Sequence, residues 1–135
     1  MSAQFQKDEG LRMIAEQTMK EAAERDPLDL FPLRTSNLRI GFQYCSQEKM
    51  SKGKIVFADC EKVKEKFKEF MPYDFIITFY QPNTDGLSEE AIKRLMYHEL
   101  HHIGITEDGA FNIVPHNLED FRECIDRWGI DWIKE

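Results

Sequence analysis

Residues 88–104 have the sequence SEEAIKRLMYHELHHIG, and this stretch carries the strongest structural signal in the chain. Ser88 can accept a backbone N–H bond at the start of a helix, and the two glutamates that follow favour the positive end of the helix dipole. Leu87 and Ile92 have the spacing of a hydrophobic staple. Gly104 is placed to end the helix in a left-handed cap. The stretch therefore predicts an amphipathic helix with four buried apolar side chains: Ile92, Leu95, Met96 and Ile103.

The same helix contains His98-Glu99-Leu100-His101-His102, which is an HExxH pattern. Residues four apart lie one turn apart on a helix face, so His98 and His102 can hold one tetrahedral metal ion. Glu99 is then placed to act as general base toward the water that the metal activates. All four histidines lie between positions 98 and 116, and exposure to solvent gives no reason for such clustering. The pattern therefore predicts a zinc site with Glu99 as its catalytic residue.

A catalytic zinc site takes three protein ligands and leaves the fourth position open. His116 is the leading candidate for the third ligand, because it follows His102 by fourteen residues and a loop could return it to the metal. We expect His101 to lie outside the ligand set, since pairing it with His98 would leave Glu99 without its role. The alternatives are glutamates of a later helix or carboxylates of the intervening loop, in that order: Glu119, Glu123, Asp108 and Glu107.

Three strands are predicted in the middle of the chain. Residues 38–45 alternate apolar and polar side chains, as a half-buried strand requires. Residues 54–59 follow the polar loop 46–53, so we expect these two segments to pair as a hairpin. Residues 73–80, YDFIITFY, are mostly β-branched or aromatic, which is typical of a central strand covered on both faces. The expected sheet is three-stranded and mostly antiparallel.

Helices are predicted on both sides of this strand region. Residues 8–25 carry apolar side chains at helical spacing, and residues 26–37 contain two prolines typical of a connector. Residues 61–70 predict a short helix with a charged, solvated face, and residues 117–129 predict a last helix. Together these elements predict one α+β domain over residues 1–135, with the sheet packed against the first helix and the HExxH helix.

The composition supports a folded domain and excludes several classes of function. The chain has 135 residues, of which 41% are hydrophobic and 12% aromatic, enough to build a core. A formal net charge of -7 argues against nucleic-acid binding through the net electrostatic field. No apolar run is long enough for a membrane span, and the three cysteines form no CxxC pair, so a cytoplasmic location is expected. The sequence does not indicate an oligomeric state.

Four segments carry a resemblance to known proteins: SKGKIVFADCEKV at residues 51–63, DFIITFY at 74–80, MYHELHHIG at 96–104 and PHNLEDF at 115–121. The four segments follow one another in the same order as in the putative phage metallopeptidase family, so residues from about 36 to 130 resemble that family. An HExxH pattern followed at fourteen residues by a histidine is also similar to the SprT-like metalloproteases. Asn117 replaces the glycine of the SprT motif, however, and the zinc-ribbon cysteines of those proteins are absent.

The resemblance implies a small zincin-like domain with His98, His102 and His116 as zinc ligands and Glu99 as base. The expected function is zinc-dependent hydrolysis of a peptide bond in a peptide or protein substrate, by an enzyme of phage or prophage origin. Two alternatives stay open: a non-catalytic, zinc-stabilised module that binds a host protein, and a DNA-associated SprT-like protease. The second would need a basic surface, for which the only reservoir is the lysines at positions 49, 52, 54, 62, 64, 66 and 68.

Overall fold

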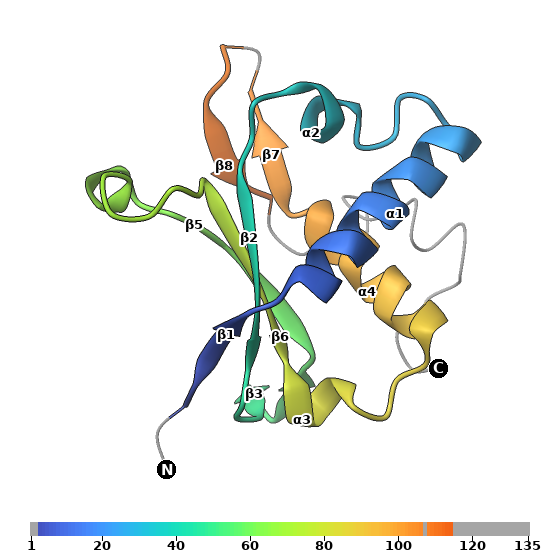
Figure 1. The fold of residues 1–135 in the computed structure, drawn as a ribbon, viewed down its shortest axis with the longest axis vertical. Helices are drawn as coiled ribbons and strands as arrows, with labels where there is room; N and C mark the ends of the chain where they lie inside the picture. Colours follow the sequence, from blue (N-terminus) through green and yellow to red (C-terminus); the bar gives the residue numbers. More distant parts are fainter. Residues whose placement is uncertain (1–2, 107, 115–135) are drawn as a thin grey trace.

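The computed structural model describes residues 3–106 and 108–114. These residues form a mixed four-stranded sheet with two main helices, α1 (Glu9–Arg25) and α4 (Glu89–Leu100), packed side by side on one face (Figure 1). The α+β class is therefore confirmed, whereas the extent of one domain over residues 1–135 stays a prediction. The predicted last helix lies outside the described residues. In spatial order the sheet contains β1 (Phe5–Lys7), β2 (Ile40–Cys45), β6 (Phe75–Tyr80) and β5 (Ala58–Lys62).

Strand β6 has the central position that its sequence predicts. It pairs in parallel with β2, where Ile77 lies opposite Phe42, and antiparallel with β5, where Ile77 lies opposite Cys60. The expected hairpin between residues 38–45 and 54–59 is therefore wrong, because β6 lies between these segments. A strand that is apolar on both faces gains most from a position covered on both sides. The sheet is consequently mixed, and β1 adds a fourth strand that we did not predict.

The polar loop 46–53 contributes to a small hairpin of its own. Lys52 and Gly53 form its two-residue turn with φ angles of 52° and 77°. Positive φ at both central residues is what a type I′ hairpin turn requires. The predicted strand over residues 54–59 is thus divided at Phe57, with one part in this hairpin and the other in the main sheet. Two short strands form the hairpin: β3 (Lys49–Ser51) and β4 (Lys54–Val56).

Helix α1 forms as predicted, because the Asp8 carboxylate accepts the Leu11 N–H at 2.9 Å and caps its first turn. The connector after it contains a short helix, α2 (Phe31–Thr35), that we did not predict. Pro32 lies in the first turn of α2, where a missing N–H costs nothing. The face of α1 that packs on the core contains Leu11, Ala15, Thr18 and Ala22.

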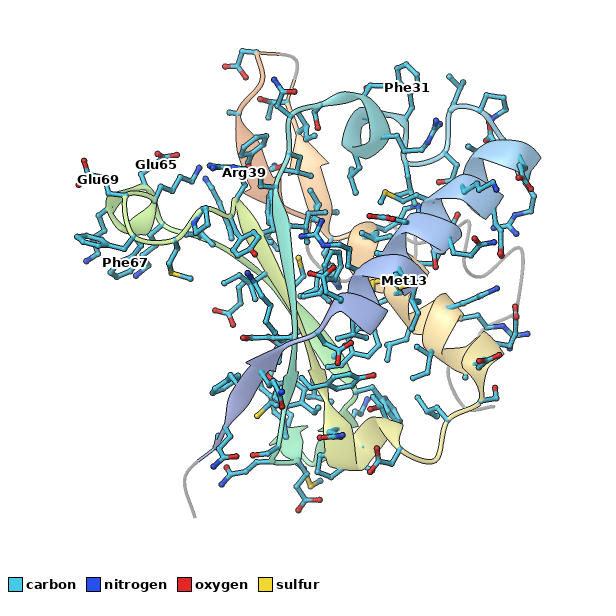
Figure 2. All side chains as sticks on the ribbon, in the orientation of Figure 1. Met13, Phe31, Arg39, Glu65, Phe67 and Glu69 are labelled. Atoms are coloured by element: carbon cyan, nitrogen blue, oxygen red, sulfur yellow. The ribbon has the colours of Figure 1, made fainter. Side chains whose placement is uncertain are left out.

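The predicted helix over residues 61–70 is wrong. Only one 3₁₀ turn, η1 (Glu65–Phe67), forms in this segment. Val63 is buried, but Phe67 is 44% and Phe70 82% exposed, so the three apolar residues share no buried face. The segment therefore leaves the sheet instead of packing on it. Figure 2 shows three of its side chains projecting outward: Glu65, Phe67 and Glu69.

Helix α4 begins as predicted, with the Ser88 hydroxyl oxygen accepting the Ala91 N–H at 3.1 Å, after the single turn α3 (Gln81–Thr84). It ends at Leu100, so the cap predicted at Gly104 is wrong. The residues that follow pair with a later segment, and this non-local pairing replaces a further helical turn. The intervening segment between His102 and His116, which we expected to be a loop, thus contains a hairpin formed by β7 (Ile103–Ile105) and β8 (Phe111–Ile113).

Within the described part of the chain, neither main helix combines the length and the apolar content needed to cross a bilayer.

Candidate metal centre

His98, Glu99 and His102 lie together at the carboxyl end of α4. Each offers one ligand atom, and these atoms all lie within 4.8 Å of one another. His101 keeps helical dihedral angles (φ -74°, ψ -11°), so the helical turn continues past Leu100 to His102. The two imidazole rings meet edge to face with their centroids 5.1 Å apart. The last turn therefore brings together the three residues that the HExxH pattern predicted.

The β7–β8 hairpin holds the ring of His102. Its Nδ1 lies 2.6 Å from the carbonyl oxygen of Val114, whose N–H donates to the carbonyl oxygen of His102 at 2.7 Å. A carbonyl oxygen only accepts, so Nδ1 carries the proton and Nε2 keeps the lone pair that a metal needs. The HExxH pattern did not predict this partner. Asp108-Gly109, a dipeptide typical of hairpin turns between apolar segments, was the signal that could have found it.

The Glu99 carboxyl is buried, with only 2% of the residue exposed. Its Oε1 has no hydrogen-bond partner among the described residues. Burial, with a smaller contribution from the Asp59 carboxylate, raises the pKa of Glu99 to about 8. A buried carboxylate is costly unless a cation or donors offset its charge. A metal cation at the two histidines would supply that charge, so the donor set and the orphaned oxygen both fit a metal ion.

A cavity of about 280 Å³ opens beside Glu99 and His102. Its walls come from the edge of the main sheet and from both hairpins, and they are mostly apolar. Burial and the neighbouring Glu99 carboxyl raise the pKa of the Cys60 thiol, so Cys60 lines the cavity as a neutral group. The polar groups of Glu99 and His102 thus face a space in which a substrate could lie. Five further residues complete the lining: Val56, Ala58, Asp59, Cys60 and Ile113.

The other candidate ligands have different positions. His101 does not belong to the metal group, because its Nδ1 lies 2.8 Å from the Tyr97 carbonyl oxygen and its Nε2 lies 3.2 Å from Asp29 Oδ1. Asp108 lies in the β7–β8 turn, where its carboxylate accepts bonds from the Thr106 hydroxyl and the Ala110 N–H. It too is separate from the group. Four candidates lie outside the described residues: Glu107, His116, Glu119 and Glu123.

Comparison with models of known protein families agrees with this site. The model of the family described as putative phage metallopeptidase matches residues 3–135. The chain belongs to this family. The phage metallopeptidase match extends beyond residues 36 to 130, which carried the resemblance in the sequence, and includes β1, α1 and α2. No curated protein and no solved structure matches the chain.

In this member of the phage metallopeptidase family, we expect Glu99 to destabilise the metal-free protein as pH rises from about 4.5 to about 8. The folded-state pKa of about 8 exceeds the ordinary value of 4.5, so in this range the folded state holds a proton that the unfolded state has released. Rising pH therefore favours unfolding. The stabilisation from neutral Glu99 is complete below about pH 4.5 and is lost as pH passes about 8.

Urea unfolding in chelator tests this expectation with Glu99→Gln as the reference. Every other ionisable group is common to the two proteins, so the difference between them reports residue 99, and the gain in unfolding free energy from Glu99→Gln should grow by a few kcal/mol across the range. A gain that is the same at both ends of the range would contradict the expected ionisation of Glu99.

Proposed function

We propose that this chain is a zinc-dependent peptidase. The observation that carries the proposal is the buried Glu99 carboxyl, which lies within 4.8 Å of both imidazole donors and lines a cavity with His102. Membership of a metallopeptidase family supports a protein or peptide as substrate. Zinc is the proposed metal because neutral imidazole nitrogens suit it and because a zinc site needs only a small ligand set.

His98 and His102 would supply two nitrogen donors, and the bond from His102 to the Val114 carbonyl oxygen would keep its Nε2 available. We propose His116 as the third donor, on the basis of its spacing from His102 and of the family resemblance. Three protein ligands would leave one position open, as catalytic zinc sites require. When bound, zinc supplies a Lewis acid that polarises the scissile carbonyl and makes water more acidic.

Glu99 would act as general base and then as general acid. Its carboxylate would take a proton from the attacking water and pass it to the amine that leaves. A cation beside a carboxyl group favours the ionised form, so metal binding would offset the burial that raises the pKa of Glu99. Metal binding and proton transfer would therefore be coupled, because a bound metal would keep the Glu99 carboxylate ionised and able to accept a proton.

The edge of the sheet offers a place for the substrate backbone. β5 is an outer strand and pairs with β6 on one side. Three of its residues, Ala58, Asp59 and Cys60, line the cavity that Glu99 shares. An extended peptide laid along a strand edge would place its carbonyl groups near the catalytic carboxyl. This arrangement would bind the substrate mainly through its backbone.

Removal of metal should abolish hydrolysis, and zinc should restore it. The test measures release of dye from labelled casein by protein treated with chelator and dialysed, before and after addition of one equivalent of zinc. Magnesium serves as the control, because it prefers oxygen ligands and should restore nothing. Equal hydrolysis with and without metal would contradict the proposal. Zinc binding without hydrolysis of casein or of a peptide library would favour the non-catalytic binding module instead.

A further inference from the structure

A buried polar cluster lies beside the metal group and has no part in the chemistry above. The hydroxyl of Tyr97, a residue with 0% exposure, donates to Asp29 Oδ2 at 2.6 Å. His101 places Nε2 3.2 Å from Asp29 Oδ1 and Nδ1 2.8 Å from the Tyr97 carbonyl oxygen. The rings of Tyr97 and His101 are in contact, with centroids 4.3 Å apart. Asp29 thus engages both side chains, one with each carboxylate oxygen.

Asp29 itself is held by the connector between α1 and α2. Its N–H donates to the Asp26 carbonyl oxygen at 3.0 Å, and its carbonyl oxygen accepts from Arg34 Nε at 3.4 Å and Nη2 at 3.3 Å. The next residue, Leu30, is buried and has a left-handed φ of 56°. That conformation is strained for a non-glycine residue and persists only where the surroundings impose it. The connector therefore presents the carboxylate in a defined place.

Tyr97 and His101 each directly precede a histidine of the metal group. Consecutive helical residues are about 100° apart, so the stripe formed by Tyr97 and His101 runs alongside the stripe formed by His98 and His102. His101 and His102 follow the last residue of α4, at a place where helices fray. The two contacts of Asp29, one with Tyr97 and one with His101, span this final turn and can hold it in shape.

We propose that Asp29 is a positioning residue for the metal site. It would set the separation of His98 and His102 by holding Tyr97 and His101 from one side, while Val114 holds His102 from the other. This inference rests on the proposed role of the two histidines as metal donors. It adds that the metal site includes a residue far from the HExxH motif in sequence.

Cobalt binding tests the inference, because the visible absorption of Co²⁺ reports the geometry of its ligands as well as its occupancy. Asp29→Ala should change the absorption spectrum and weaken cobalt binding by up to roughly 10–100-fold, the range for groups bonded directly to a metal ligand, because Asp29 acts through the neighbouring Tyr97 and His101. Asp29→Asn should restore most of both, since an amide keeps an oxygen for the Tyr97 hydroxyl and a polar group for His101. Tyr97→Phe removes the hydroxyl that donates to Asp29 and leaves the contact between Asp29 and His101, so it should cause a smaller loss in the same direction.

Asp74→Ala is the matched control. Asp74 is also buried, with 5% exposure, and accepts bonds from the Arg39 N–H at 2.9 Å and from Lys68 Nζ at 3.2 Å. It precedes β6, and the partners of its carboxylate, Arg39 and Lys68, lie outside α4, so its loss should lower thermal stability and leave the cobalt spectrum and affinity unchanged. A similar weakening by Asp74→Ala would show general destabilisation and overturn the inference.

The remaining outcomes separate this inference from the proposed function. Wild-type affinity and spectrum in both Asp29→Ala and Tyr97→Phe would overturn the positioning role, even if the wild-type protein hydrolyses casein. If Asp29→Ala does not fold, Tyr97→Phe decides the question by the same two measurements, and wild-type affinity and spectrum in that variant would overturn the positioning role. If the variants show the expected changes in cobalt binding but the wild-type protein hydrolyses no substrate, the peptidase proposal is rejected and the positioning role of Asp29 is kept. Failure of the wild-type protein to bind cobalt would overturn both.

Discussion

Glu99→Gln should reduce peptide hydrolysis by roughly 10²–10⁴-fold, the usual contribution of general acid–base catalysis, while the protein still binds zinc. The amide has nearly the same shape as the carboxyl but cannot take a proton from water. Because Glu99 is not one of the proposed nitrogen donors, the metal should stay bound. The measurement is the casein hydrolysis rate of a variant whose zinc content has been determined.

Glu89→Gln is the matched control for this variant. Glu89 lies in the first turn of the same helix and is exposed, so the identical substitution should leave the rate unchanged. Hydrolysis that persists in zinc-loaded Glu99→Gln, from a preparation free of contaminating protease, would remove Glu99 as the base. Loss of zinc from Glu99→Gln would instead indicate that the carboxylate is itself a ligand.

Alanine in place of His98, His102 or His116 should weaken zinc binding by more than about 100-fold in each case. This loss should exceed the roughly 10–100-fold effect of removing a group behind a ligand, because a donor atom disappears. Competition with a coloured chelator measures the affinity, with Glu99→Gln as the variant that should bind normally. Wild-type affinity in His98→Ala or His102→Ala would reject the metal centre itself.

We also expect the same alanine variants to differ from the wild-type protein in how chelation changes the melting temperature. The helices and strands bury an apolar core of their own, so chelation should lower the melting temperature of the wild-type protein by mass action and leave it folded. The three alanine variants should show little further loss on chelation. A His116→Ala protein with wild-type affinity and an unchanged chelation effect would show that His116 is not the third ligand. Glu119 and Glu123 would then be the next candidates.

Local sequence determined the parts of this protein that depend on neighbouring residues. Ser88 caps α4 because a hydroxyl at that position can accept an orphan N–H, whatever the rest of the fold is. The four-residue spacing of His98 and His102 places them on one helix face for the same local reason. The central position of residues 75–80 also followed from their composition, since a strand apolar on both faces must be covered on both.

Only the tertiary structure decided features that depend on pairing between distant segments. β6 lies between β2 and β5, and the chain from Ile103 onward leaves the helix to pair with β8. In both cases non-local hydrogen bonds and burial outweigh weak local preferences. That pairing brings Val114 to the ring of His102. The fold likewise carries Asp29 to Tyr97, which is 68 positions away in sequence. The sequence thus determined which residues are candidate metal ligands. The pairing of distant backbone segments determined which atoms hold the side chains of these residues and which cavity the side chains face, since no local pattern encodes such contacts.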